Sequence, residues 1–348
     1  MPINDSKLAI NGGTPVTKQP IIIHKPYLAE DDFIAIDTTA RSTFISGNGP
    51  QCMEFEKQFA EYLGMKHVLF TNSCTTALDL AFKAKNFPAG SEVIVPNFTY
   101  TSTALGPLLN NLKIRLCDVY GDNGNIDSAK VLNLINEKTV AIMPVDYAGN
   151  PADSDAINSI ARKYNLFVVQ DAAQSIGSMY KDKKTGSLSD VTCFSFHGTK
   201  NLTTGEGGAL VTNDDQLAEL AKFIREKGTN KQSFLIDNKS RGFYEYETIG
   251  SSFVQSNILG ALAGSQLKKI DWITAERKAI AEYYYENLKD LPNIKFNRIT
   301  EAALTNWHIF GILVPPEHRY WIMDAGELKV YWQTYIIHHC TETNFIKD

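Results

Sequence analysis

The sequence has few of the features that mark secreted, membrane or nucleic-acid-binding proteins. Residues 1–18 lack the basic segment and apolar run of a signal peptide. No apolar run approaches the ~20 residues that span a bilayer. The net charge is -5, so there is no basic surplus for binding a polyanion through bulk charge. We therefore expect a cytoplasmic protein that binds neither a membrane nor nucleic acid.

Cysteine is scarce, and its spacing forms no pairs. The chain has five cysteines, an odd number, and none belongs to a Cys-x-x-Cys pair. They are Cys52, Cys74, Cys117, Cys193 and Cys340. This pattern argues against a disulfide framework and a zinc site, and we expect most of these residues to be small buried hydrophobes. The adjacent His338 and His339 lack metal spacing on a helix, so no metal site is predicted.

Several short motifs of common enzyme classes are also missing. The chain has no G-x-x-x-x-G-K-[ST] loop, no G-x-G-x-x-G after a strand, no H-E-x-x-H and no G-x-S-x-G. A site for a phosphorylated ligand must then be built locally, from backbone amides and a few side chains.

What the sequence does contain is an alternation of helical stretches with short, β-branched apolar runs between about residues 55 and 215. Strands are predicted at residues 67–71, 92–96, 113–119, 139–145, 166–170 and 191–195. Helices are predicted at residues 55–63, 75–85, 128–136 and 151–164. This alternation indicates a mostly parallel sheet covered on both faces, and such sheets bind ligands at the carboxyl ends of their strands.

A second, smaller unit is predicted after the sheet. Residues 257–288 have one long helical pattern with a charged face, and a shorter α+β segment follows. We therefore divide the 348 residues into a large domain, residues 1–255, and a smaller C-terminal domain, residues 256–348.

Asp171 stands directly after one predicted strand. A buried carboxylate at that position is costly unless a cation or a proton donor meets it. A pyridinium nitrogen is such a partner, because keeping it protonated makes a pyridine cofactor an electron sink. Capping of a following helix is the alternative interpretation of Asp171.

Lys200 follows another predicted strand and precedes the glycine-rich residues 205–208. Desolvation there would lower the pKa of its amine and make it a nucleophile and a proton shuttle. The same position also suits an ordinary surface lysine. A third polar segment, residues 71–76, spans a strand-to-helix junction whose hydroxyls and free amides would bind phosphate, cap the helix, or do both.

Together, these three segments resemble the DegT/DnrJ/EryC1/StrS family of sugar aminotransferases. The similarity extends from residue 8 to about residue 313. It passes through residues 8–13, 46–49, 73–78, 96–100, 145–149, 171–174, 194–200 and 205–208. Within the family, residues 196–201, 225–230 and 249–252 are most similar to enzymes that aminate C4 of dTDP-4-keto-6-deoxyglucose.

The resemblance implies a fold-type I aminotransferase: a large domain with a mixed, mostly parallel sheet flanked by helices, plus a smaller C-terminal α+β domain. It implies a pyridoxal 5'-phosphate cofactor and ping-pong, Schiff-base transfer of the amino group of L-glutamate to a nucleotide-linked 4-keto-6-deoxy sugar. The product would be a dTDP-4-amino-4,6-dideoxyhexose for O-antigen, lipopolysaccharide or other polysaccharide synthesis. The protein would be a homodimer with shared active sites.

Position by position, the resemblance makes Lys200 the Schiff-base lysine and Asp171 the partner of the pyridinium nitrogen. It implies that Gln174 approaches the phenolic oxygen of the cofactor and that Tyr100 stacks on the pyridine ring.

The phosphate group would be held by Cys74, Thr75 and Ser195. Cys74 stands where many relatives have glycine, so its backbone amide is expected to bind. Ser252 occupies the place of a phosphate-binding asparagine, on a segment that crosses to the partner subunit's cofactor. His197, Arg225 and Lys227 are candidates for contacting the nucleotide diphosphate, although a cationic helix face is usually only solvated.

Two departures from the family pattern affect these expectations. Asp146 replaces a histidine that is common in its block, and we expect it to form a local ion pair rather than to alter substrate preference. Residues 320–348 match the family poorly, and a shortened C-terminal domain is the simplest explanation. Two alternatives stay open: a pyridoxal-dependent sugar dehydratase, whose relatives have histidine at position 200, and an inactive or sensory cofactor-binding protein.

Overall fold

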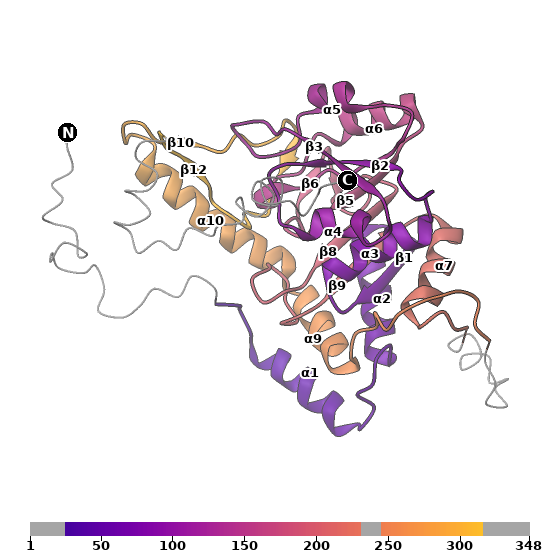
Figure 1. Cartoon of the computed structure of the whole chain (residues 1–348). Coiled ribbons are helices and arrows are strands. Elements are labelled where there is room, and N and C mark those ends of the chain that lie inside the picture. Colours follow the sequence, from indigo (N-terminus) through magenta and orange to yellow (C-terminus); the bar gives the residue numbers. More distant parts are fainter. Residues whose placement is uncertain (1–24, 231–244, 316–348) are drawn as a thin grey trace, which may run out of the picture.

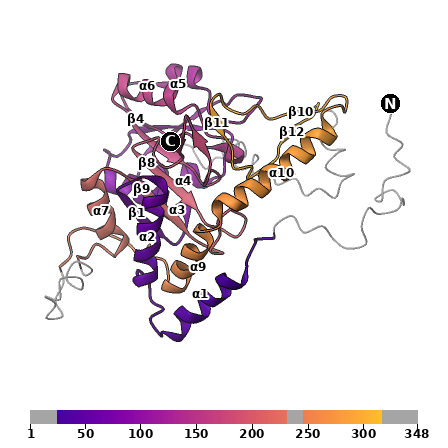
Figure 2. The same cartoon turned by 180° about the vertical axis from the view of Figure 1, so that it is seen from behind.

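The structure, a computed structural model, describes residues 25–230 and 245–315 (Figures 1 and 2). The predictions on residues 8–13 and 320–348, on His338 and His339, and on Cys340 lie outside these ranges. Within them, no helix has the length and apolarity needed to cross a membrane.

A seven-stranded sheet forms the centre of the molecule, in the order β1-β9-β8-β5-β4-β2-β3. Its strands are β1 (His67–Thr71), β2 (Glu92–Pro96), β3 (Lys113–Cys117), β4 (Thr139–Ile142), β5 (Phe167–Asp171), β8 (Val191–Ser195) and β9 (Gly208–Thr212). Only β9 within this sheet runs antiparallel to its neighbours, β1 and β8. The mixed, mostly parallel α/β sheet confirms the predicted fold class.

The helices flank this sheet. They are α1 (Glu30–Arg41), α2 (Pro50–Leu63), α3 (Cys74–Lys85), α4 (Ser102–Leu108), α5 (Ser128–Leu134), α6 (Ser154–Tyr164), α7 (Asp215–Arg225), α9 (Asn257–Leu267) and α10 (Ile270–Leu288). Side-chain caps fix several starts, because Ser73, Asp153 and Asp214 each accept a backbone N–H of the helix that follows.

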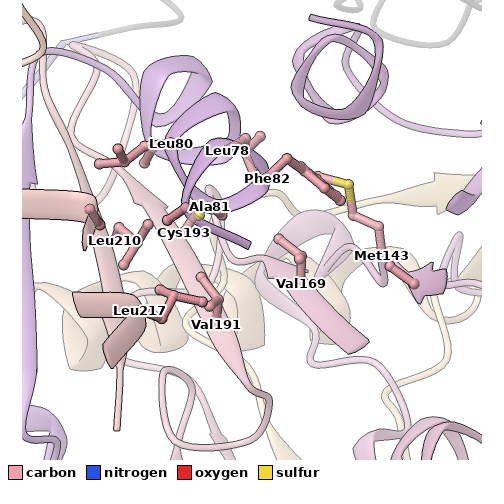
Figure 3. Packing of buried hydrophobic residues seen from close by; sticks show 14 of the residues in the cluster. Leu78, Leu80, Ala81, Phe82, Met143, Val169, Val191, Cys193, Leu210 and Leu217 are labelled. Carbon is pink, nitrogen blue, oxygen red and sulfur yellow. The ribbon is translucent and has the colours of Figure 1, made fainter. Parts of the chain in front are cut away.

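Alternate residues of each strand enter two separate layers of core. On one face, Val191, Cys193 and Leu210 pack with α3 and α7, as Figure 3 shows for this cluster. On the other face, Phe194 and Val211 pack with α2 and α9. Farther along this second face, β2, β4 and β5 pack with α5 and α6. Burial on both faces explains why the strands are continuous apolar runs.

The region after the sheet differs in one respect from its prediction. The helical pattern of residues 257–288 is divided into α9 and α10. Lys269 stands at the break, where its Nζ pairs with Asp31 and with the buried Asp32 of α1. This pairing gives the predicted charged face a structural role at the junction.

The α10 helix leaves the sheet and runs beside short strands (Figures 1 and 2). The short strands beside α10 are β10 (Lys295–Phe296) and β12 (Ile312–Leu313). A separate small sheet contains β6 (Met179–Tyr180), β7 (Lys183–Lys184) and β11 (Ala303–Leu304). The division into domains at residue 256 stays a prediction. Ala263 and Leu267 of α9 share a buried cluster with Phe55 of α2, so α9 packs on the large sheet.

Candidate active site

Several predicted site residues meet at one edge of the sheet. β1, β5 and β8 point in the same direction, and β9 starts at the edge where they end. Thr71 and Ser195 both pair with Gly208, while Asp171 pairs with Cys193, two residues before Ser195 in β8. The topology therefore brings residues separated by more than 100 positions in sequence to one place.

Asp171 is buried at the end of β5 and holds two hydrogen bonds. Its Oδ2 accepts from the Thr103 hydroxyl at 2.7 Å and its Oδ1 from the Ala173 N–H at 3.1 Å. Burial raises the pKa of Asp171, while the Thr103 and Ala173 donors and the charge of Lys200 oppose this shift. Turns follow Asp171 in place of a helix, so the helix-cap alternative is wrong.

Lys200 lies close enough to Asp171 and Cys74 for their charges to affect its pKa. Desolvation lowers the pKa of the Lys200 amine, and the neighbouring Cys74 and Asp171 groups oppose this shift. Over the part of the chain that the structure describes, Nζ has neither a hydrogen-bond nor an ion-pair partner. Lys200 is therefore a desolvated amine beside a buried carboxylate and not an ordinary surface lysine.

The first turn of α3 presents free backbone donors. Ser73 caps the helix by accepting the Thr76 N–H at 3.1 Å, but the N–H groups of Cys74 and Thr75 have no acceptor among the described residues. A Cβ on Gly208 would lie 2.3 Å from the Cys74 nitrogen, so glycine keeps this helix start open. Burial raises the pKa of the Cys74 thiol well above its usual range, which leaves the amide as the group suited to an anion.

Three further predicted residues surround this edge. Tyr100 follows β2 and is 52% exposed, so its ring is accessible to a ligand. Ser195 is buried, and its Oγ accepts the His197 N–H at 3.4 Å. Gln174 is also buried, and its Oε1 accepts the Ala148 N–H at 2.6 Å. With Oε1 in this bond, the Gln174 side chain would meet a ligand oxygen through its Nε2 amide.

Thr103 was missed by sequence reasoning, although it donates the shortest hydrogen bond to Asp171. Its Oγ1 also lies 2.7 Å from the Thr99 hydroxyl, so a chain of hydrogen bonds connects the Asp171 carboxylate to two buried hydroxyls. A threonine near a helix start is most often a cap or a solvated residue, and no local pattern links it to a strand end 68 residues away.

A cavity of about 450 Å³ opens beside Lys200. It is lined by residues 25–27, the loop after β8, one face of α10 and residues 307, 308 and 310. The wall includes the aromatic rings of Trp272, Tyr284 and Trp307. Desolvation lowers the pKa of Arg277 in its wall. Within the described chain this cation has no carboxylate partner, and its Nη1 lies 3.5 and 3.4 Å from the Trp307 and His308 carbonyl oxygens. Sequence reasoning missed this wall because Arg277 belongs to a helix with many charges.

The three cations predicted to contact a diphosphate are placed differently. Arg225 is 3% exposed, pairs with Glu56 and donates to the Phe70 carbonyl at 3.0 Å. Its charge is neutralised inside the protein, so Arg225 is a structural residue. Lys227 is exposed beyond α7, and the exposed His197 ring lies 3.7 Å from Glu206. Contact of these two residues with a diphosphate stays a prediction.

Ser252 lies next to the start of α3 but is not among the buried residues at the sheet edge, such as Asp171 and Ser195. It is exposed and bridges to Glu226, while the adjacent Phe253 carbonyl accepts the Asn72 N–H at 3.1 Å. This position leaves Ser252 on the surface, so its role as a phosphate ligand stays a prediction.

The ion pair expected for Asp146 is wrong. Its fully buried carboxylate accepts hydrogen bonds from three neutral donors, the Ala152 N–H, the Gln170 Nε2 and the Ser175 hydroxyl. Burial raises the pKa of Asp146 to about 6. The sequence could not reveal these partners, because a carboxylate after an apolar run gives no indication of what donates to it.

The site as a whole fits pyridoxal phosphate. Asp171 offers a buried carboxylate without a bonded cation, and Lys200 offers an amine without a bonded partner among the described residues. The open amides of Cys74 and Thr75 suit a phosphate, and the exposed ring of Tyr100 suits a planar group.

The chain is similar to known proteins in sequence and in fold. The profile of the DegT/DnrJ/EryC1/StrS aminotransferase family matches residues 26–341. GDP-perosamine synthase of Caulobacter vibrioides is 40% identical over 271 residues, which are 77% of this chain and 70% of that protein. UDP-4-amino-4,6-dideoxy-N-acetyl-beta-L-altrosamine transaminase of Campylobacter jejuni is 32% identical over 291 residues, covering 83% of this chain and 75% of that one.

A solved structure agrees over more of the chain. PseC of Helicobacter pylori, an aminotransferase involved in the biosynthesis of pseudoaminic acid, superposes with a TM-score of 0.86 and 29% sequence identity. The superposition covers 95% of this chain and 90% of that one.

Proposed function

The chain belongs to the DegT/DnrJ/EryC1/StrS aminotransferase family and is a pyridoxal-phosphate-dependent sugar aminotransferase; from this premise, we propose that it transfers the amino group of L-glutamate to C4 of dTDP-4-keto-6-deoxyglucose. The observation that carries the proposal is the desolvated Lys200 amine beside the buried Asp171 carboxylate. The Campylobacter relative is named as a transaminase of a 4-amino-4,6-dideoxy sugar, which supports amination at C4.

The residues at the sheet edge would divide the chemistry between them. Pyridoxal phosphate, when bound, supplies an electron-withdrawing ring that stabilises negative charge at the carbon bearing the transferred amine. Lys200 would hold the cofactor through its amine and, once displaced, move a proton to and from that carbon. Asp171 would keep a proton on the ring nitrogen. L-Glutamate gives up its amine and leaves as 2-oxoglutarate, and the ketosugar then takes the amine.

The cavity beside Lys200 would admit the substrates. Its size is in the range of ligand sites, and its aromatic walls together with the cations Lys25 and Arg277 suit a sugar nucleotide, which combines planar and anionic groups. We propose Arg277 in place of Arg225 as the cation of this wall, with His197 and Lys227 as outer contacts.

A homodimer would complete the site. The exposed Ser252 hydroxyl would reach the phosphate of the partner subunit's cofactor, and the chain would act as a large domain, residues 1–255, with a smaller one after it. Surface-polysaccharide synthesis, such as O-antigen assembly, and a cytoplasmic location would follow from this substrate.

The phosphate end of the site can be tested at Gly208. In Gly208→Ala, the added Cβ would crowd the Cys74 amide, so we expect a loss of affinity for pyridoxal phosphate of at least about tenfold. Affinity for pyridoxal, which lacks the phosphate, should change little. Equilibrium binding to the apoprotein measures both. Gly121→Ala is the control, since apart from its chain neighbours no atom of the described residues lies within 4 Å of its added Cβ. An equal loss for both ligands would contradict the phosphate assignment.

The proposed reaction is tested by incubating the protein with L-glutamate and the 4-keto-6-deoxy sugar attached to dTDP, GDP or UDP, then analysing the products by NMR. We expect a new amine at C4 in the dTDP arm. Turnover confined to the GDP or UDP arm would contradict the proposed nucleotide, and a deoxygenated product without an amine would indicate a dehydratase. No reaction in any arm would contradict the proposed function.

A further inference from the structure

We propose that Asp146 is a positioning residue that sets the orientation of the Gln174 amide toward the cofactor. The proposal rests on the proposed function only in taking Gln174 as the contact to the phenolic oxygen of pyridoxal phosphate. Asp146 itself would touch neither cofactor nor substrate.

The backbone places Asp146 beside the carboxylate of the site. Val145 bridges to Asp171, the Asp171 N–H donates to the Pro144 carbonyl at 2.9 Å, and the Asp146 N–H donates to the Asp171 carbonyl at 3.1 Å. The chain after β4 therefore continues the parallel pairing as far as the last residue of β5. Its next side chain, that of Asp146, is fully buried behind the site.

The two carboxylate oxygens of Asp146 hold two different segments. Oδ1 accepts the Ala152 N–H at 3.0 Å, which closes the loop of residues 146–152 on itself. Oδ2 accepts the Ser175 hydroxyl at 2.6 Å and the Gln170 Nε2 at 2.8 Å, which fixes the turn after β5 against the end of that strand.

The contact between these two segments is made by Gln174. Its Oε1 accepts the Ala148 N–H at 2.6 Å. The donor, Ala148, belongs to the loop that Oδ1 of Asp146 closes. The acceptor, Gln174, directly precedes Ser175, whose hydroxyl donates to Oδ2 of Asp146. Ala148 has a φ of 61°, a conformation that a non-glycine residue keeps only when its surroundings impose it. One carboxylate thus fixes both partners of the bond that orients Gln174.

The chemistry of the carboxylate explains why a neutral amide would not replace it. Three donors converge on Asp146, and an ionised carboxylate can accept from all of them. Asparagine has one acceptor oxygen, and its NH₂ would face at least one of these donors. No cation contributes, since no ion pair to Asp146 exists within residues 25–230 and 245–315. Asp171 is the titratable group whose charge adds to the raised pKa of Asp146.

The test uses the apoprotein and two ligands, pyridoxal phosphate and its 3-deoxy analogue, which lacks the phenolic oxygen. The ratio of their dissociation constants measures recognition of that oxygen. We expect Asp146→Asn to lower the preference for pyridoxal phosphate by about threefold to tenfold. We expect the same of Gln174→Ala, because both changes weaken the hydrogen bond between Gln174 and the phenolic oxygen. The double variant should lose no more than Gln174→Ala alone, since both changes would remove the same contact.

A purely structural role would give a different result. Asp146→Asn would then lower the melting temperature without changing the preference, or its effect would add to that of Gln174→Ala, and either outcome would overturn the proposal. A wild-type protein that binds pyridoxal phosphate and the 3-deoxy analogue equally well would also overturn the proposal. The amino-transfer assay with the 4-keto-6-deoxy sugars tests the proposed function independently of this result.

Ser175→Ala provides a milder variant in case Asp146→Asn does not fold. It removes one donor and should lower the preference in the same direction, with an unchanged preference counting against the proposal. Ser187→Ala is its control, because among the described residues that hydroxyl donates only to the nearby Lys184 carbonyl, at 2.9 Å.

Discussion

Replacing Lys200 by alanine is expected to reduce amino transfer at least about 10³-fold and to abolish the visible absorption of cofactor held through the lysine amine. The physical reason is that Nζ would be both the group that attaches the cofactor and the base that moves the proton. Desolvation, which lowers the pKa of Lys200, raises the fraction of neutral amine near neutral pH, and this is the form that attacks a carbonyl. Steady-state turnover and the absorption spectrum of the purified protein measure the two effects.

Lys57→Ala is a matched control for this variant. Lys57 is an exposed lysine of α2, so its loss changes the net charge equally without reaching the site. Lys200→Ala should keep its thermal stability, because Nζ makes no hydrogen bond or ion pair with any described residue. Full turnover by Lys200→Ala would refute the mechanism, and partial recovery by an added small primary amine would support the role of the missing amine.

The sequence predicted the sheet edge because the information there is local. Apolar runs marked β1, β5 and β8, and each run ended in a polar segment whose residue types suited one part of a cofactor. The parallel direction of these strands then follows from the intervening helices, so their ends must meet. Strand β9 was not singled out, since Gly205 to Gly208 looks like a loop although Gly208 already pairs with Thr71 and Ser195.

What the sequence could not predict depends on partners distant along the chain. Arg225 was a candidate for contacting a diphosphate, but its partner Glu56 lies 169 residues away along the chain and pairs with it in the interior. Asp146 looked like half of an ion pair, yet its donors come from a loop, a strand and a turn. Thr103 carried no signal at all, although it fixes one oxygen of Asp171. Such contacts are set by packing, which no local pattern encodes.

Asp171→Asn is expected to slow both half-reactions by about 10²-fold or more while leaving the apoprotein at least as stable as the wild type at neutral pH. Asparagine can satisfy both neighbours, because its oxygen can accept the Ala173 N–H while its NH₂ donates to the Thr103 hydroxyl, which can then donate to Thr99. Its neutral amide, however, cannot keep a ring nitrogen protonated. The variant should lose rate but not stability, and the expectation for stability follows from the raised pKa of Asp171. A carboxyl whose pKa is higher in the folded protein stabilises the fold below its unfolded pKa, and this stabilisation is lost as pH rises through the folded pKa.

Rapid-mixing measurements with L-glutamate alone and then with the ketosugar separate the two half-reactions, and melting curves of the apoprotein between pH 4 and pH 8 test the stability. Thr103→Val should slow the half-reactions less, because it removes one hydrogen-bond donor from Asp171 and leaves the carboxylate in place. Thr103→Ser, which keeps the hydroxyl, should restore the rates. Unchanged half-reaction rates in Asp171→Asn would leave the buried carboxylate with no role in the chemistry. Slow rates combined with an apoprotein of higher melting temperature would mean that Asp171 is retained for catalysis at a cost to the fold.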